Sequence, residues 1–304
     1  QNEKINMIDV SFIILTYNEE IHLKRCLSSI RGLSDQVFLV DSHSTDETCE
    51  IGRSMGAQVY QRPWPGKHSE QFNWGLDNLP IQTKWVFKLD ADEYLTEELC
   101  EELRVRVSSL PEDSTGIVFP LRRVFMGRHI QRGTGTVRLL RMFRYGKARC
   151  EARWMDEHIQ PESGCLVDFE HEFADDNLQD IGWWTRKHDG YALREAIDLL
   201  DIELGLLAAQ ENTVALSEEA QTKRKMKERY VRQPLFFRAC LYFIYRYFFK
   251  RGFLDGVEGF LWNFLQGWWY RTLVDAKIYE IKKACGNDVA KIKTHLKRHY
   301  SLEV

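Results

Sequence analysis

The sequence lacks the features that mark several large classes of protein. Its 304 residues carry a net charge of only −3, so there is no global positive field for nucleic acid. Its seven cysteines include no C-x-x-C pair and no zinc-ligand spacing. It also has no internal repeat and no low-complexity tract. We therefore expect no nucleic-acid partner, and we expect reduced thiols in a cytosolic compartment.

Long uninterrupted apolar runs are also missing. The apolar stretch from Leu235 to Phe249 is interrupted by Arg238 and Arg246. It is also shorter than the ~20 residues that a membrane-spanning helix needs. The polar residues 1–6 do not resemble a signal peptide, and we expect the native chain to begin at Met7. The length suits one large domain or two smaller ones with an ample core.

The most informative stretch of the sequence runs from Trp85 to Glu93, where an apolar segment ends in two aspartates one residue apart. Its aromatic and β-branched residues favour a strand, and ligands of open α/β sheets bind beyond the carboxyl ends of strands. Two carboxylates so close together are costly without a cation. Asp90 and Asp92 therefore predict an Mg²⁺ or Mn²⁺ site facing a nucleotide diphosphate. Taken alone, this pattern fits a solvated turn better.

The rest of the N-terminal half strengthens the nucleotide interpretation. Apolar runs and helical periodicity alternate along it, and Ser44 with Glu47 matches a helix capping box. This order predicts a largely parallel, doubly wound α/β sheet, with Thr16–Asn18, Asp41 and Asp90–Asp92 at one edge. The expected strands are 10–15, 36–40, 57–61 and 85–90, and the expected helices are 19–30, 44–56 and 70–79.

Composition changes toward the C-terminus. A helix capped by Thr96, strands at 116–125 and 136–144, and a helix from Asp180 are expected first. Residues 231–270 are then dense in aromatics and hold five basic residues against two acidic ones. An aromatic, basic segment too short to span predicts a helix pair lying in a membrane interface. The alternative is a helical subdomain whose aromatics pack on the catalytic domain or on a second subunit.

Three motifs together resemble the signatures of family 2 glycosyltransferases of the GT-A fold: ILTYNEE at 14–20, VDSHSTDET at 40–48 and LDADE at 89–93. Residues 64–66, 71–73 and 87–93 are similar to the bacterial branch that includes the lipopolysaccharide core β-1,4-glucosyltransferases. The resemblance covers roughly residues 7–196. It implies a GT-A catalytic domain at 7–177. A helical region at 178–304 would follow, with an interfacial membrane-binding segment at about 231–271.

The resemblance also implies roles for individual residues. Asp41 would hydrogen-bond the uracil, Asp90 would contact ribose or metal, and Asp92 would ligate the metal. The branch usually has a basic residue where this chain has Phe72, so Lys67 or Lys88 is expected to contact the diphosphate instead. The full set expected to bind nucleotide is Thr16, Tyr17, Asn18, Glu19, Asp41, Lys67, Asn73, Asp90 and Ala91.

Two further clusters receive roles from the same resemblance. The sequence Asp156-Glu157-His158 corresponds to an acceptor-side motif, in which Asp156 is the expected general base and Glu157 the alternative. A surface acidic turn is the competing interpretation. GT-A enzymes often place a late histidine on the metal, so His171 or His158 is expected to join Asp92 and Asp90.

The predicted activity is a metal-dependent, inverting hexosyl transfer. The donor would be a nucleotide sugar, with UDP the expected nucleotide, and the acceptor a glycan or a polyprenyl-linked glycan of bacterial cell-surface polysaccharide or lipopolysaccharide synthesis. The enzyme would lie peripherally on the anionic cytoplasmic face of the inner membrane. One alternative is a sugar nucleotidylyltransferase, although residues 16–20 lack the Gly-rich, basic first loop of that class. A non-catalytic membrane scaffold with a dead nucleotide site is the other.

Overall fold

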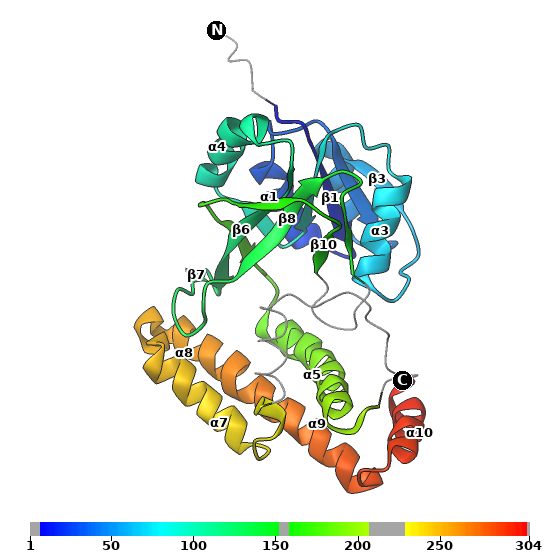
Figure 1. The fold of residues 1–304 in the computed structure, drawn as a ribbon, viewed down its shortest axis with the longest axis vertical. Coiled ribbons are helices and arrows are strands. Elements are labelled where there is room, and N and C mark those ends of the chain that lie inside the picture. The colour runs from blue at the N-terminus through cyan, green and yellow to red at the C-terminus, as the bar shows by residue number, and fades with distance from the viewer. Residues whose placement is uncertain (1–6, 152–157, 207–228, 303–304) are drawn as a thin grey trace. The chain divides into compact units, whose positions relative to one another are not determined.

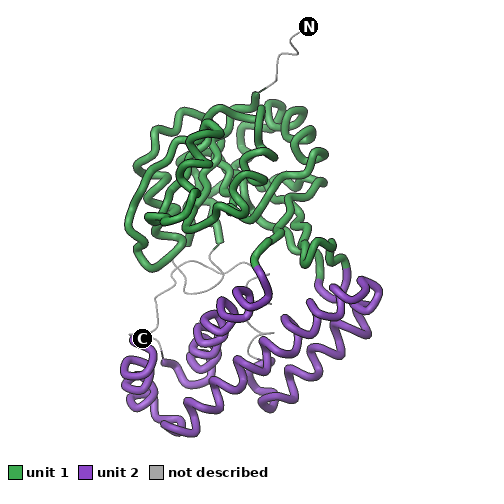
Figure 2. Tube along the Cα trace, turned by 180° about the vertical axis from the view of Figure 1, so that it is seen from behind, with its two compact units in different colours: residues 1–131, 135–179 green, residues 132–134, 180–304 purple. Residues whose placement is uncertain are grey.

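The protein is represented by a computed structural model that describes residues 7–151, 158–206 and 229–302 (Figure 1). Its chain forms two compact units (Figure 2). The sheet unit comprises residues 1–131 and 135–179, and the helical unit comprises residues 132–134 and 180–304. Residues 132–134, which lie inside the expected first domain, thus belong to the helical unit.

The sheet unit begins with four parallel strands. These are β1 (Val10–Thr16), β2 (Val37–Asp41), β3 (Gln58–Gln61) and β4 (Trp85–Asp90), in the spatial order β3-β2-β1-β4. Strand β1 pairs in parallel with both β2 and β4. The carboxyl ends of these three strands therefore lie at one edge of the sheet, as the sequence predicts.

The remainder of the sheet is mixed rather than parallel. Strand β8 (Arg138–Arg144) runs antiparallel to both β4 and β6 (Ser114–Phe125), because no crossover helix separates β6 from β8. Strand β12 (Phe173–Asp176) is parallel to β6 and antiparallel to β5 (Glu93–Leu95). The expected parallel, doubly wound pattern thus describes only the first four strands. The short strands are β7 (Arg128–His129) and β11 (Cys165–Asp168), which pair with β6, and the hairpin of β9 (Ala148–Cys150) and β10 (Ile159–Pro161).

Four α-helices of the sheet unit follow the predicted order, with one corrected start. The α2 helix begins at Thr48 rather than at the predicted capping box, because the Ser44 side chain bonds to Asp41 and to the backbone of Asn18 instead. Thr96 does cap α4, accepting a hydrogen bond from the Leu99 amide. The bounds are α1 (Glu20–Ser29), α2 (Thr48–Ser54), α3 (His68–Asn78) and α4 (Glu97–Arg106), with a 3₁₀ turn η1 (Val107–Ser109).

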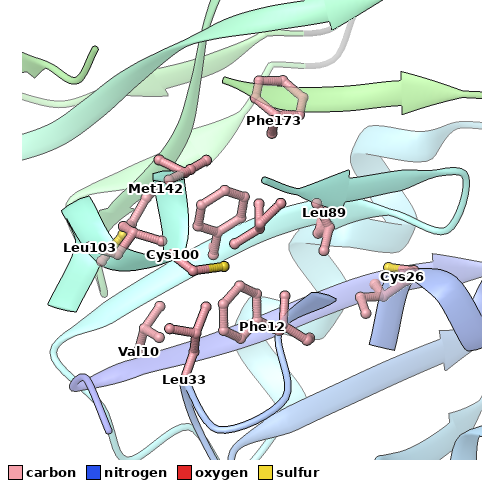
Figure 3. Close-up of a cluster of buried hydrophobic side chains, with 14 of the residues drawn as sticks. Val10, Phe12, Cys26, Leu33, Leu89, Cys100, Leu103, Met142 and Phe173 are labelled. Carbon is pink, nitrogen blue, oxygen red and sulfur yellow. The ribbon is translucent and has the colours of Figure 1, made fainter. Parts of the chain in front are cut away.

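Two apolar clusters cover the faces of the sheet. On one face Phe12, Phe87 and Phe119 lie in a row, with neighbouring ring centroids 5.3 Å apart. Phe12 shares its cluster with Cys26 of α1 and Leu103 of α4 (Figure 3). On the other face Phe38 of β2 belongs to a second cluster with Phe72, which α3 carries. Strands buried on both sides must be apolar almost throughout, which explains the continuous runs in β1 and β4.

The helical unit is built around a contact between α5 (Ile181–Leu204) and α9 (Tyr270–Cys285). The α5 helix begins close to the predicted start, and Asp180 caps it by accepting a hydrogen bond of 2.7 Å from the Trp183 amide. None of the described helices is both long enough and apolar enough to cross a membrane. The other elements are α7 (Phe237–Ile244), η2 (Tyr245–Phe249), η3 (Gly252–Asp255), α8 (Gly256–Phe264), η4 (Leu265–Trp269) and α10 (Val289–Tyr300).

Two basic residues expected to face a membrane are buried. The Arg238 guanidinium pairs with the Asp275 carboxylate, and both side chains are almost fully enclosed. The Arg246 Nε donates to the Gly133 carbonyl at 3.1 Å. Trp269, which lies in the expected membrane-binding segment, packs against the α5–α9 core. These three residues therefore serve the interior of the helical unit.

Candidate nucleotide and metal site

The strand register brings the predicted polar residues together. In β1, Leu15 stands opposite Asp90 of β4, and Thr16 stands opposite Asp41 of β2. The Thr16 hydroxyl donates to an Asp41 carboxylate oxygen at 2.9 Å. A ligand at this edge of the sheet would therefore meet residues from three strands at once.

Asp41 is fully buried, and its carboxylate accepts four hydrogen bonds. The donors are the Thr16 hydroxyl, the Gln61 amide, and the hydroxyl and backbone amide of Ser44. Burial acts to raise the pKa of Asp41, but these hydrogen bonds outweigh it and lower the pKa below its ordinary value. Direct pairing of Asp41 with uracil would require one donor to move away. In this structure Asp41 organises the loop, and its contact with uracil stays a prediction.

The loop after β1 is locked to the loop after β2. Asn18 adopts a left-handed backbone conformation, with φ of 54°. Its amide donates to the Ser44 hydroxyl, and its side-chain oxygen accepts from the Thr45 amide, both at 2.8 Å. Tyr17, by contrast, is 60% exposed at the same edge. Its ring is therefore the best placed of the predicted residues to stack on a base.

Asp90 is held by two cations. One carboxylate oxygen accepts from the Lys88 ammonium at 2.8 Å, and the other accepts from the Arg141 guanidinium at 3.1 Å. Burial acts to raise the pKa of Asp90, but Lys88 and Arg141 outweigh it and hold the pKa well below its ordinary value. Both oxygens are thus engaged, which favours Asp92 over Asp90 as a metal ligand. Ala91, between them, is buried.

Two more acids lie beside this turn. Glu93 accepts a hydrogen bond from the Asp90 amide and contacts Arg141, and Asp175 lies opposite Glu93 in the β5–β12 pair. Burial raises the pKa of Glu93 to about 8, with Asp90 adding to this effect and Arg141 opposing it. Burial together with Asp92 and Asp90 raises the pKa of Asp175 to about 6. The turn therefore carries more acidic groups than its cations neutralise.

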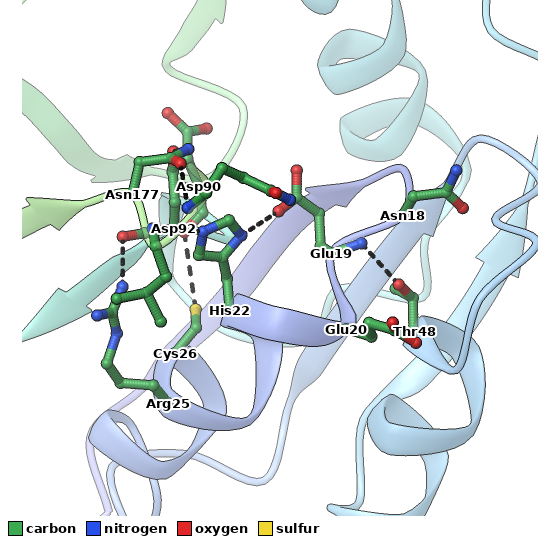
Figure 4. Close-up of polar contacts among 12 residues, drawn as sticks. Asn18, Glu19, Glu20, His22, Arg25, Cys26, Thr48, Asp90, Asp92 and Asn177 are labelled. Carbon is green, nitrogen blue, oxygen red and sulfur yellow. Dashed lines mark hydrogen bonds and ion pairs between the residues drawn. The ribbon is translucent and has the colours of Figure 1, made fainter. Parts of the chain in front are cut away.

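Asp92 belongs to the same turn, and one of its carboxylate oxygens accepts from the Asn177 side-chain amide at 3.0 Å (Figure 4). Within residues 7–151, 158–206 and 229–302, no three His, Cys, Asp or Glu side chains form a ready metal cage. One or two carboxylates with substrate phosphates are nevertheless a common binding mode for Mg²⁺. The carboxylate oxygens of this acidic turn are suitable ligands for a hard divalent ion that a diphosphate also binds.

His171 lies elsewhere, which corrects its predicted role. Its Nδ1 is 2.9 Å from a Glu102 carboxylate oxygen on α4. His171 precedes strand β12 in the chain. The first residue of β12, Phe173, pairs with Leu95, and Asp175, two residues further along, pairs with Glu93 near Asp92. The strand direction thus carries His171 away from the Asp90–Asp92 turn. His158 is exposed, and its carbonyl accepts a hydrogen bond from the Glu151 amide.

Three other residues predicted to bind nucleotide have different surroundings. Glu19 contacts the buried His22 through its carboxylate, at 2.6 Å. Asn73 is held by the backbone of Cys150, both as donor at 2.8 Å and as acceptor at 3.0 Å. Lys67 lies 3.9 Å from Glu70. Phe72 is fully buried, so the side chain that replaces a basic residue here belongs to the core.

The predicted general bases, Asp156 and Glu157, lie outside the described residues. The flanking strands are paired with each other, with Cys150 of β9 opposite Ile159 of β10. Asn73 fixes that hairpin by bonding to Cys150. Asn73 therefore holds the strand that leads into the segment of the predicted catalytic acids.

Three residues beside the acidic turn were not predicted from the sequence: Arg141, Asp175 and Asn177. Each comes from a segment far along the chain, and only the pairing of β8 and β12 with the sheet brings it to the Asp90–Asp92 turn. A weak signal was present at Asp175-Asp176, an acidic pair that ends a short strand as Asp90 ends β4.

This α/β fold, with acids at the ends of parallel strands, is GT-A-like. The model of glycosyl transferase family 2 matches residues 11–172, more than half of the chain, and the protein belongs to this family. The lipopolysaccharide core biosynthesis glycosyltransferase LpsC of Rhizobium meliloti is 24% identical over 290 residues, covering 91% of this chain and 94% of LpsC.

Other relatives match shorter stretches or only distantly. An uncharacterized glycosyltransferase of Rickettsia typhi, RT0209, is 34% identical over 107 residues, or 35% of this chain; the match spans only 36% of that relative's length. Among solved structures, the mannosyltransferase PcManGT from Pyrobaculum calidifontis, in complex with GDP-Man and Mn²⁺, is 13% identical. It has a TM-score of 0.48, with 90% of this chain and 87% of that chain covered.

Proposed function

We propose that the protein transfers a sugar from a nucleotide donor, UDP-linked, to a hydroxyl group of a glycan or lipid-linked acceptor. The observation that carries this proposal is the meeting of three polar strand ends, from β1, β2 and β4, beside an acidic turn. Such an edge offers one surface for a base, a ribose and a diphosphate. Family membership supports transfer of a sugar rather than of a nucleotidyl group.

Asp92, with Asp90 beside it, would hold Mg²⁺ or Mn²⁺ together with the donor diphosphate. Bound there, the ion would neutralise charge on the leaving diphosphate. Lys88 lies 14% exposed against Asp90 and is the cation of this edge best placed to approach the phosphates. The chain's own part in donor binding is thus to orient the diphosphate by charge and to leave the face of Tyr17 for the base.

The transfer itself needs a base on the acceptor side. Asp156, with Glu157 as the alternative, would take the proton from the acceptor hydroxyl as its oxygen forms a bond to the anomeric carbon. The bond from that carbon to the diphosphate oxygen breaks, and the electron pair leaves with UDP. Attack in line with the leaving group inverts the anomeric centre. The Asn73-anchored hairpin would hold the base segment at its two ends.

The acceptor is proposed to be lipid-linked and to lie at a membrane. Residues 248–257 of the helical unit expose a dense set of apolar side chains, and Phe249 is 76% exposed. Large exposed apolar patches on folded proteins mark interaction sites, and Lys250 and Arg251 add exposed positive charge here. We define this surface as the apolar tip. Its exposed apolar residues are Phe248, Phe249, Phe253, Leu254 and Val257.

The apolar tip favours an anionic lipid surface over a spanning segment. Aromatic and aliphatic side chains would enter the acyl boundary, while the neighbouring cations would meet lipid head groups. This would hold the enzyme peripherally, on the cytoplasmic face of the inner membrane. The name of LpsC supports an acceptor in lipopolysaccharide core synthesis.

A screen of nucleotide sugars tests this function most directly. In the presence of Mn²⁺, UDP-sugars should raise the melting temperature of the full chain, because a ligand stabilises the state that binds it. The stabilising donor would then be incubated with acceptor fractions while release of UDP is measured. Stabilisation by no nucleotide sugar, or release of pyrophosphate instead of UDP, would overturn the proposal.

A further inference from the structure

One side of helix α1 contacts the Asp90–Asp92 turn. Arg25 and Cys26 follow His22 by three and four positions, so each lies on the same side of the helix as His22. All three reach either the Asp90–Asp92 turn or the segment that follows β12 (Figure 4). The first helix after the nucleotide loop thus contacts both strands that carry the acids.

The buried His22 ring bridges two segments, the start of α1 and the residues that follow β12. Its ring is 1% exposed, Nδ1 lies 2.6 Å from a Glu19 oxygen, and Nε2 accepts the Leu178 amide proton at 2.9 Å. Since Nε2 is an acceptor, the ring proton sits on Nδ1 and is donated to Glu19. These two hydrogen bonds therefore fix the backbone of Leu178 to the start of α1.

Arg25 joins the same two segments by charge. One guanidinium nitrogen contacts the Asp176 carboxylate at 2.5 Å, and the other donates to the carbonyl oxygens of Asp176 and Asp92. The Asp176 amide in turn donates to the Asp92 carbonyl at 3.1 Å. The backbones on both sides of Asn177 are thereby held, at Asp176 by Arg25 and at Leu178 by His22.

Asn177 itself is oriented at both ends of its side chain. Its oxygen accepts from the Gln179 amide at 3.0 Å, which leaves the NH₂ group to donate to the Asp92 carboxylate at 3.0 Å. Partners of this kind, one step behind a metal ligand, fix the direction of the ligand. Their loss typically costs about 10–100-fold in metal affinity.

We propose that Asn177, held by His22 and Arg25, is the positioning residue that aims the Asp92 carboxylate at the divalent ion. This inference rests on the proposed function, since it takes Asp92 as the metal ligand. It assigns Glu19 and His22 a role in metal binding through the backbone of Leu178, in place of a direct contact with nucleotide.

The test measures Mn²⁺ binding to the full-length protein by electron paramagnetic resonance at saturating UDP. Asn177→Ala should weaken Mn²⁺ binding about 10–100-fold. His22→Gln should weaken it in the same direction, because the Leu178 anchor is disturbed. Asn78→Ala is the matched control: its amide bonds only within α3, to the Trp74 carbonyl, and it should bind Mn²⁺ as the native protein does. Melting temperatures and UDP affinity in EDTA should stay the same for Asn177→Ala, which a loss of general packing would not allow.

Two results would overturn the inference, and they differ from each other. If the native protein binds Mn²⁺ and Asn177→Ala binds it equally well, the positioning role fails while the metal site stands. If the native protein and Asp92→Asn show the same weak Mn²⁺ binding, the metal site and the positioning role fail together.

Discussion

The two units each bury charged side chains, but they do so differently. In the helical unit, Arg238 and Asp275 form one pair with almost no exposed surface. Asp275 accepts from Arg238 and from the Phe236 amide, and Arg238 also donates to the carbonyls of Tyr230 and Val231. Every formal charge in this group has an opposite partner. Such a closed group holds the fold together and has nothing to offer a ligand.

The acidic turn of the sheet unit is not balanced in this way. Arg141 serves both Asp90 and Glu93, while Asp92 and Asp175 add further acid. Burial is the largest cause of the raised pKa values of Glu93 and Asp175, and neighbouring acids add to it: Asp90 for Glu93, and Asp92 with Asp90 for Asp175. The comparison teaches that a buried charge cluster is better judged by its balance than by its size. A balanced cluster is structural, whereas we expect an acidic surplus at a strand end to bind a cation.

The largest effect is expected from removing the negative charge of Asp92. Asp92→Asn should reduce transfer with saturating Mn²⁺ to the level that the native protein shows in EDTA, because a neutral amide is a poor ligand for a hard cation. The fold should be retained. Donor turnover measured with and without EDTA checks this, and activity in the variant that still responds to Mn²⁺ would contradict it.

The second effect concerns the acceptor side of the reaction. Asp156→Asn should lower turnover by roughly 10²–10⁴-fold, the usual contribution of a positioned base. Donor affinity should stay nearly unchanged. Steady-state rates and UDP-sugar binding would be measured in the same preparations. A greater loss in Glu157→Gln than in Asp156→Asn would exchange the two roles.

The third effect tests the balanced pair. Asp275→Ala should lower the free energy of unfolding by about 3–5 kcal/mol, because Arg238 would remain buried without its partner. The control is Glu203→Ala, which removes the more exposed pair with Lys282 and should cost about 0–1 kcal/mol. Urea unfolding followed by circular dichroism compares the two variants. Equal losses would mean that the Arg238–Asp275 pair is not the structural group described above.

The smallest effect concerns the surface of the helical unit. Replacing Phe248 and Phe249 with Ser should weaken sedimentation with anionic liposomes, since each buried Phe contributes about 1.5–3 kcal/mol of transfer free energy. UDP-sugar binding should not change. Val105→Ser, which removes an exposed apolar side chain from α4, is the control. A native protein that ignores liposomes, or that buries these rings in a dimer, would refute the membrane proposal.

Much of the sheet could be predicted from sequence because its signals are local. Apolar runs in β1 and β4 and the polar residues after them specify buried parallel strands and the edge where they end. Interactions between distant residues were out of reach. Ser44 looked like a helix cap but is bonded to Asp41, and Arg141 and Asn177 meet the acidic turn only through the pairing of β8 and β12. The metal contact predicted for His171 was out of reach for the same reason, because the direction of β12 decides where His171 lies.

The central claim is that the acidic turn binds a divalent ion together with the donor diphosphate. Isothermal titration of UDP into the full-length protein, with Mn²⁺ and then with EDTA, tests it most directly. We expect UDP to bind the native protein more tightly with Mn²⁺, and we expect Asp92→Asn to bind UDP equally in both conditions. UDP affinity that is independent of Mn²⁺ in the native protein, or a full Mn²⁺ effect in Asp92→Asn, would contradict the claim.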